Sequence, residues 1–299
     1  MGILFAVLSA LGYSASYILV QLGLRKSKSH NGDFLSLFAA MITVAALYMA
    51  MNLFGDSKTE EFNWLGILFF ASAGFFTAFL GRAFIFMGIR RIGSSRTVAI
   101  KNSAPVFTVL IAILFMHERI SLWGGIGMAM IFVTLIEQAR YDFKRPLLAS
   151  QTDNKVGLIL SFIAAICFGI GQAARKQGLV YFAEPIMGSL IGSAFALLMF
   201  ILIRLSKRDF SFVQKTELAL PNLYFIGAGV ITGFAQLSFF FSLMFTKLSY
   251  TSVVAAMEPI ITIILGIFFL EKEENITLRL GVTAGIVFLG TIIIIFTGK

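Results

Sequence analysis

The stretch Ser103-Ala104-Pro105-Val106-Phe107-Thr108 recurs in outline, after a shift of 154 residues, as Met257-Glu258-Pro259-Ile260-Ile261-Thr262. Each copy carries a proline followed three residues later by a threonine. Each then runs into an apolar segment that ends at a glutamate, Glu118 in the first copy and Glu271 in the second. Self-similarity at a fixed spacing is typical of a chain built from repeated units.

The similarity extends outward from these two stretches over both halves of the chain. Pairs of equivalent positions, at shifts of 154 to 156 residues, include Arg82 with Gln236, Gly2 with Gly157, Gly23 with Gly178, and Gly125 with Gly281. Drifts of one or two residues are what short loop insertions produce. We therefore expect a first repeat at residues 1–139, a connecting loop at 140–154 and a second repeat at 155–299.

The composition indicates that the surface of this protein faces hydrocarbon. Of the 299 residues, 58% are hydrophobic and 13% are charged, whereas about a quarter of the residues of a soluble domain are charged. A helix needs about 20 apolar residues to cross a bilayer. The sequence predicts ten such spans, at about 2–22, 34–54, 63–87, 96–116, 121–139, 156–176, 185–205, 222–245, 249–270 and 277–296.

The same features argue against other classes of protein. Continuous apolar runs favour helices over the alternating strands of a β-barrel. The single cysteine, Cys167, allows no disulfide framework, and it shares no metal-ligand spacing with His30 or His117, so we expect no metal and no cofactor. The net charge of +9 arises from basic residues in short gaps between spans, which favours a lipid bilayer and not nucleic acid as the partner.

Five spans in each half have a topological consequence. Because five is odd, the second repeat must enter the membrane upside down relative to the first. Inverted repeats are the architecture of many secondary transporters, whose substrate site lies near the midplane between the halves. The expected fold is therefore an all-α integral membrane protein of ten transmembrane helices, arranged as two inverted five-helix repeats.

The two copies of the proline–threonine stretch, each followed by an apolar run and a glutamate, resemble paired EamA modules of the drug/metabolite transporter superfamily. The resemblance covers essentially the whole chain. It implies ten helices around a central cavity, alternating access and no ATP-binding domain. It leaves the substrate open, since members of the superfamily carry amino acids, organic acids, sugars, nucleotide sugars and drugs.

Ionisable residues inside spans cost roughly 2.5–3.5 kcal/mol each on insertion scales and require a reason. Lys101 and Glu258 lie deep in the fourth and ninth spans, which are repeat mates, so we expect the two charges to meet near the pseudo-two-fold axis. The pair is either purely structural or exchanged for substrate or proton. Arg175, Lys176 and Glu137 lie at span ends, where a long side chain can extend to the lipid headgroups (snorkelling). For these three residues snorkelling is a simpler explanation than a functional role.

The prolines beside these charges predict helix breaks. Pro105 and Pro259 lack an N–H, so the carbonyl group four residues earlier in each helix is left free. Loosened backbone is tolerated at membrane depth where it lines a cavity.

The candidate substrate-binding residues are polar or ionisable side chains on the inner faces of the spans: Tyr13, Ser16, Tyr17, Arg82, Thr97, Lys101, Asn102, Gln172, Gln236 and Glu258.

The basic residues also predict an orientation. The gaps after odd-numbered spans carry 16 basic residues, against four to six on the opposite side. By the positive-inside rule, the odd gaps are cytoplasmic and both termini lie outside a plasma membrane of bacterial type. The family resemblance implies the reverse, with both termini in the cytoplasm. We follow the charge bias, because the loops are short.

The leading functional hypothesis is a secondary active transporter, not an enzyme. It moves a small polar metabolite of the amino acid or organic acid class by alternating access, with ion or proton coupling or by exchange. The motivation is the excess of deep positive charge, Arg82 and Lys101 against Glu258. The alternatives are a drug or cation efflux protein that uses Glu258 and a non-transporting membrane sensor or scaffold. Both a monomer and a homodimer are compatible with the sequence.

Overall fold

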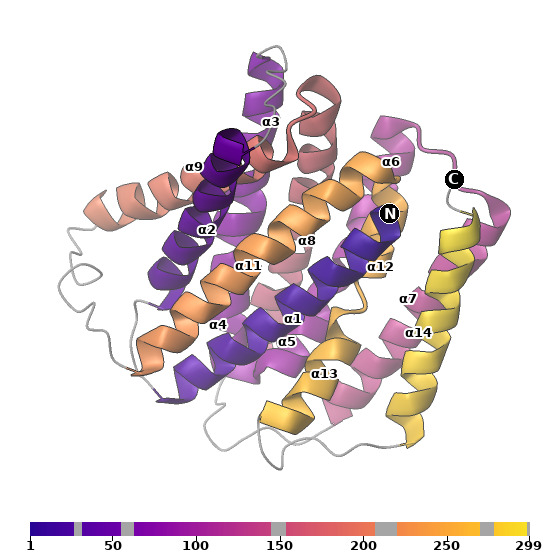
Figure 1. Ribbon diagram of the computed structural model, residues 1–299. Coiled ribbons are helices and arrows are strands. Elements are labelled where there is room, and N and C mark those ends of the chain that lie inside the picture. The colour runs from indigo at the N-terminus through magenta and orange to yellow at the C-terminus, as the bar shows by residue number, and fades with distance from the viewer. Residues whose placement is uncertain (27–31, 55–62, 145–153, 207–219, 270–277, 298–299) are drawn as a thin grey trace.

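The computed structural model describes the whole chain except residues 27–31, 55–62, 145–153, 207–219, 270–277 and 298–299. Within the described ranges every regular element is a helix (Figure 1). The first half contains α1 (Gly2–Lys26), α2 (Gly32–Phe54), α3 (Trp64–Gly74), η1 (Phe75–Gly81), α4 (Arg82–Ile92), α5 (Ser94–Lys101), α6 (Ala104–Met116) and α7 (Leu122–Lys144). The second half contains α8 (Asn154–Tyr181), α9 (Pro185–Ser206), α11 (Leu220–Phe245), α12 (Leu248–Ala255), α13 (Glu258–Phe269) and α14 (Leu278–Thr297).

Eight helical segments of the described chain are long and apolar enough to cross a membrane. Several of these join neighbouring elements, such as Trp64–Ile92 and Leu248–Phe269. The fifth and tenth expected spans, in α7 and α14, have shorter apolar stretches, Leu122–Thr134 and Gly285–Ile294. The helical architecture is thus confirmed, and the count of ten spans stays a prediction.

Four expected spans end before their helices do, because the helices continue past their apolar runs. The first of them, α1, continues to Lys26 instead of ending at residue 22. The third span continues to Ile92 instead of ending at residue 87, and α8 continues to Tyr181 instead of ending at 176. Helix α7 extends to Lys144, into the expected connecting loop. A helix can carry charged residues where it leaves the hydrocarbon region. The last residue of an apolar run is therefore not the last residue of the hydrogen-bonded helix.

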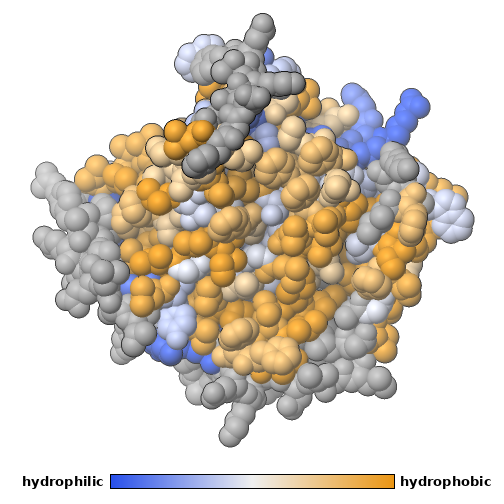
Figure 2. Space-filling view, viewed as in Figure 1, coloured by the Kyte–Doolittle hydropathy of each residue, from blue (hydrophilic) through white to orange (hydrophobic). Residues whose placement is uncertain are grey.

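Large apolar side chains cover the outside of the bundle. Figure 2 shows them spread over one face, with hydrophilic side chains gathered near its edges. Trp64 and Trp123, at the starts of α3 and α7, are exposed at positions typical of an interfacial aromatic belt. Exposed leucines and phenylalanines lie along the helices between the edges, among them Leu4, Leu8, Leu11, Phe268, Phe288 and Leu289. This surface fits a lipid bilayer.

The packing of the two halves is reciprocal, as a pseudo-two-fold relation requires. Helix α1 packs along α11, and its repeat mate α8 packs along α3, η1 and α4, the mates of α11. Helix α2 packs on its own mate α9, and α7 packs on its own mate α14. Figure 1 shows α1 crossing in front of this arrangement, with the start of α1 and the end of α14 at the same end of the bundle.

The fourth and ninth spans are broken at the predicted places. Helix α5 ends at Lys101 and α6 begins at Ala104, while α12 ends at Ala255 and α13 begins at Glu258. These boundaries correspond under the shift of 154 residues found in the sequence. Each proline is the second residue of its new helix, where the missing N–H removes no hydrogen bond of that helix. Since α5 packs on α13 and α6 on α12, the two broken spans cross at their breaks.

A second irregularity shapes the third span. Between α3 and α4, the segment η1 is a π-helix, whose wider turns shift the following residues around the helix axis. Short π segments inside α-helices are frequent at functional sites. Here the segment positions Thr77 and the first residue of α4, Arg82, toward the centre of the bundle.

Candidate functional site

The crossing point of the broken spans contains a buried ion pair. Lys101 Nζ lies 2.5 Å from Glu258 Oε2, and both side chains are 4% exposed. Asn102 Nδ2 donates to the carbonyl oxygen of Ala256, its own repeat mate, at 2.7 Å. Ser14 of α1 donates to the carbonyl oxygen of Glu258 at 3.0 Å. The expected Lys101–Glu258 contact is confirmed, and carbonyl groups at the break of the ninth span have internal partners.

Three aromatic rings surround the Lys101 ammonium group. Its Nζ atom lies 4.8 Å from the ring centroid of Phe168, 5.7 Å from that of Tyr17 and 5.9 Å from that of Tyr13. Phe168 and Tyr13 are repeat mates under the shift of 155 residues. Cation–π attraction stabilises a desolvated ammonium group by up to about 2 kcal/mol. The three rings thus compensate part of the cost of burying Lys101.

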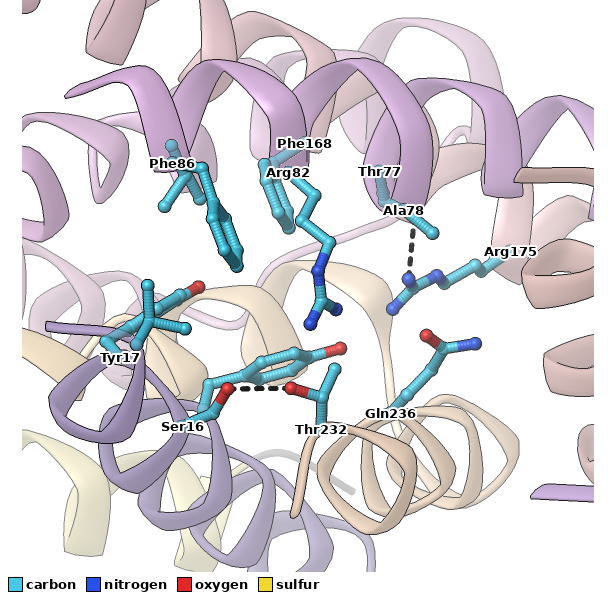
Figure 3. A pocket seen from close by; sticks show the side chains of 13 residues that line it. Ser16, Tyr17, Thr77, Ala78, Arg82, Phe86, Phe168, Arg175, Thr232 and Gln236 are labelled. Carbon is cyan, nitrogen blue, oxygen red and sulfur yellow. Dashed lines mark hydrogen bonds between the residues drawn. The ribbon is translucent and has the colours of Figure 1, made fainter. Parts of the chain in front are cut away.

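The same three aromatic residues border a central cavity, shown in Figure 3. The centre of a water-sized sphere can occupy about 30 Å³ of this cavity. One water needs about 10–15 Å³ on this measure, so this conformation has room for a small molecule only. The cavity is lined by Tyr13, Ser16, Tyr17, Val20, Thr77, Ala78, Arg82, Ile85, Phe86, Phe168, Arg175, Thr232 and Gln236.

One wall of the cavity is basic. Arg175 Nη2 of α8 donates to Thr77 Oγ1 at 2.8 Å, and Thr77 passes its own hydrogen to the carbonyl oxygen of Ala73 at 2.7 Å. Arg82 donates from Nη2 to Ser36 of α2, while its buried Nε has no hydrogen-bond partner among the described residues. Figure 3 shows both guanidinium groups pointing into the cavity from the third and sixth spans.

The opposite wall is neutral and comes from α1 and α11. Ser16 and Thr232 are joined by a hydrogen bond of 2.8 Å, and Thr232 also donates to the carbonyl oxygen of Ala228 at 2.7 Å. Gln236 lies one helical turn beyond Thr232, facing Arg175 (Figure 3). The hydroxyl group of Tyr17 is buried without a partner in the described chain. This wall therefore offers hydroxyl and amide groups without charge.

Close approach of the third and sixth spans depends on small residues. A Cβ atom on Gly81 would lie 2.7 Å from the Phe168 ring, and one on Gly171 would collide with the side chain of Thr77. Glycine at both positions lets the two helices bring Arg82 and Arg175 to one wall.

Of the ten candidate residues from the sequence, five line the cavity: Tyr13, Ser16, Tyr17, Arg82 and Gln236. The other five are buried elsewhere. Lys101, Asn102 and Glu258 lie at the crossing point behind the aromatic rings. Gln172 accepts a hydrogen bond from Thr108 at 3.1 Å, and Thr97 is buried with no partner for its hydroxyl group among the described residues.

Snorkelling was the wrong interpretation of Arg175. The residue is buried, with its guanidinium group 5.3 Å from the ring centroid of Phe240 and 5.5 Å from that of Phe239. It lies six residues before the end of α8, which is longer than hydropathy predicts. Lys176 points elsewhere and donates to the carbonyl oxygens of Leu243 and Thr246, at 2.6 and 3.1 Å.

Sequence reasoning also missed Thr77, Phe168 and Thr232. The repeat contained a usable signal, because Phe168 is the mate of Tyr13 and Thr232 is the mate of Thr77 under the shift of 155 residues. No group of three or more histidine, cysteine, aspartate or glutamate side chains that could hold a metal occurs in the described ranges.

Comparison with known proteins supports this architecture. A crystal structure described only as that of a protein superposes with a TM-score of 0.66 at 14% sequence identity, covering 97% of each chain, which shows a shared fold. No curated protein matches the sequence. The sequence model of the EamA-like transporter family matches twice, at residues 1–136 and 155–296. The expected resemblance is thus confirmed, and the chain belongs to the EamA-like transporter family of multi-pass membrane proteins in the drug/metabolite transporter superfamily.

Proposed function

We propose that this protein is a secondary transporter of a small organic anion, whose carboxylate binds between Arg82 and Arg175 in the central cavity. The observation that carries the proposal is the pair of guanidinium groups on one cavity wall. None of the described residues that line the cavity is a carboxylate. Asp33 of α2 acts electrostatically on Arg82 from outside the cavity lining. An anionic cargo would add a partner for both guanidinium groups within the cavity.

The energetics favour such a cargo. Arginine at membrane depth is costly unless it is paired or faces a water-filled space. Its planar guanidinium group matches a carboxylate with two parallel N–H···O bonds. The Nε–H of Arg82 and the hydroxyl group of Tyr17 have no hydrogen-bond partner among the described residues, so both are donors available to a bound anion. The cavity therefore favours an organic acid within the broader class of small polar metabolites.

The two alternative functions fit the same observations less well. Cation efflux through Glu258 requires this carboxylate to meet the cargo, yet Glu258 is hydrogen-bonded to Lys101 behind Phe168, Tyr13 and Tyr17. A scaffold needs no polar cavity, whereas here arginine, glutamine and tyrosine side chains converge on one. We therefore rank anion transport above both.

Alternating access is part of the proposal, with the crossing of the broken spans as its pivot. The breaks interrupt regular hydrogen bonding at the point where the two halves touch. Tilting of one half against the other would change the backbone at these breaks and leave the long helices intact. Coupling by ion, by proton or by exchange would then act through the Lys101–Glu258 pair, which lies at this pivot and against the cavity rings.

The test is binding and transport of carboxylates by arginine variants. Arg82→Gln and Arg175→Gln should each weaken binding of a small carboxylate about 10- to 100-fold, since a hydrogen bond to a charged group contributes about 1.5–3 kcal/mol. Thermal shift of the purified protein and uptake into proteoliposomes would measure the loss. Arg140→Gln is the matched control, because Arg140 is exposed on α7. Equal binding by all three variants would refute anion transport.

The orientation with both termini outside the cell membrane remains a proposal based on the basic gaps. In a Cys167→Ala background, a cysteine at Ser150 should resist an impermeant thiol reagent in intact cells, and a cysteine at Asp56 should label. Both substitution sites lie outside the described residues. The reverse labelling pattern would place both termini in the cytoplasm, as in the usual family topology.

A further inference from the structure

The repeat relation shows how the cavity acquired its polarity. Arg82 of the third span corresponds to Gln236 of the eighth, and Arg175 of the sixth span corresponds to Val20 of the first. All four residues line the cavity, so the cavity lies where equivalent surfaces of the two halves face each other. Both positive members belong to the spans that pack together, the third and sixth. A cargo anion therefore has one preferred wall, and the remainder of the cargo faces the other.

The neutral wall presents a hydrogen-bond acceptor of fixed orientation. Gln236 Nε2 donates to the carbonyl oxygen of Ser189 at 3.1 Å and lies 2.9 and 3.1 Å from the hydroxyl oxygens of Ser189 and Ser193. A carbonyl oxygen can only accept, so the amide nitrogen must be the atom that faces α9. The amide oxygen of Gln236 points away from α9 toward the cavity, as Figure 3 shows.

The hydroxyl groups beside Gln236 complete this accepting surface. Thr232 donates its hydrogen to the carbonyl oxygen of Ala228, so in the Ser16–Thr232 hydrogen bond Ser16 must be the donor. The lone pairs of Ser16 remain available. The neutral wall thus combines the Gln236 amide oxygen with the Ser16 oxygen, opposite the two guanidinium groups.

We infer that the cargo is a small hydroxycarboxylate, bound with its carboxylate on Arg82 and Arg175 and its hydroxyl group donating to Gln236 Oε1. This inference rests on the proposed function and narrows it. A second carboxylate in place of the hydroxyl group would face the amide oxygen without a hydrogen to share. An ammonium group in that place would lie near two guanidinium groups with no lining carboxylate among the described residues to offset the repulsion.

The experiment compares four three-carbon acids as ligands of the purified protein: 2-hydroxypropanoate, propanoate, 2-aminopropanoate and propanedioate. Titration calorimetry in detergent should show 2-hydroxypropanoate binding about 10-fold more tightly than propanoate, and more tightly than the other two. Equal affinity for the acids with and without the hydroxyl group would overturn the inference.

Variants of the neutral wall make the test specific. Gln236→Met keeps the size of the side chain and should reduce the preference for 2-hydroxypropanoate over propanoate to about one, with propanoate affinity retained. Ser193→Ala removes one of three acceptors of the amide nitrogen and should keep the preference, because the carbonyl oxygen of Ser189 still orients Gln236. Retention of the full preference in Gln236→Met would also overturn the inference.

The arginine variants separate the two levels of the argument. If Arg82→Gln and Arg175→Gln weaken binding of every acid as expected, while the wild-type protein binds the acids with and without the hydroxyl group equally, hydroxycarboxylate selectivity is wrong and anion transport stands. If no acid binds the wild-type protein, or the arginine variants bind as the wild type does, anion transport itself is wrong and the narrower inference falls with it.

Discussion

The two broken spans share a backbone and differ in charge. Each is interrupted for two residues at positions that correspond under the repeat, yet the first break begins after Lys101 and the second begins after Ala255. After the break the charged residue lies in the other copy, because α6 begins at the uncharged Ala104 and α13 begins at Glu258. Each half therefore contributes one member of the ion pair. The two breaks meet because they lie at corresponding positions in the two halves. The residues that differ between the halves, Lys101 and Glu258, form the ion pair at this contact.

The central cavity repeats this relation at its walls. The Arg82–Gln236 and Val20–Arg175 mates line the same cavity from equivalent positions, but both charges lie on one side. A symmetric cavity would present the same groups to both ends of a bound molecule. The two halves thus share a fold, and in the function proposed here recognition depends on the positions at which they differ.

Breaking the asymmetry at the ion pair should have the largest effect on stability. Lys101→Met or Glu258→Gln leaves the other group buried without its partner, which costs about 3–5 kcal/mol for a buried pair. The double variant should recover part of this loss, because both charges are gone. Thermal unfolding in detergent of the two single variants and the double variant would measure the coupling.

Transport by the double variant distinguishes a structural pair from a functional one. Activity that returns together with stability would indicate a purely structural role. A folded but inactive double variant is the outcome we expect, since the pair lies against three rings that border the cavity. Strictly additive losses in the single variants would contradict a direct interaction between the two side chains.

The sequence predicted this region well, because two independent signals coincide there. The proline–threonine repeat predicted the positions of both breaks, and the cost of burying isolated charges predicted that Lys101 and Glu258 would meet. Mean hydropathy and span length likewise predicted a helical membrane protein. These features follow from local chemistry and from comparison of the chain with itself.

The cavity was harder to predict, because it depends on helix rotation. Arg175 was assigned to the membrane surface since hydropathy falls near residue 176, although α8 continues to Tyr181. The π-helix η1 changes the face on which Thr77 and Arg82 lie, and no apolar periodicity reveals such a segment. Tyr17 lines the cavity, whereas its mate Gln172 accepts a hydrogen bond from Thr108 and does not line the cavity.

A smaller effect is expected from making the two breaks alike at their first turn residue. Asn102 donates to the carbonyl oxygen of its mate Ala256, so Asn102→Ala gives both breaks an alanine at this position. The substitution removes one buried hydrogen bond and leaves the carbonyl group of Ala256 buried without this donor. It should lower the free energy of unfolding by about 1–2 kcal/mol.

Ser103→Ala is the matched control for Asn102. The Ser103 hydroxyl group donates to the carbonyl oxygen of Ile100 in the same half of the chain, so this hydrogen bond does not join the two halves. Unfolding in detergent should show a smaller loss for Ser103→Ala than for Asn102→Ala. Equal losses would mean that the contact between mates contributes nothing beyond a local turn.

The smallest effect on stability is expected from substitution of the prolines, which occupy the same position in both breaks. Pro105→Ala and Pro259→Ala each restore an N–H group that can donate to a free carbonyl oxygen four residues earlier, so expression and melting temperature should stay close to wild type. Transport should fall in both variants, because a continuous helix resists the bending that the proposed alternating access requires. Pro185→Ala is the control, since Pro185 is the first residue of α9 and its missing N–H interrupts no helix. Uptake into proteoliposomes by the three variants measures the difference. Wild-type transport by Pro105→Ala and Pro259→Ala together would show that the breaks serve only to let the two halves cross, and that the pivot lies elsewhere in the bundle.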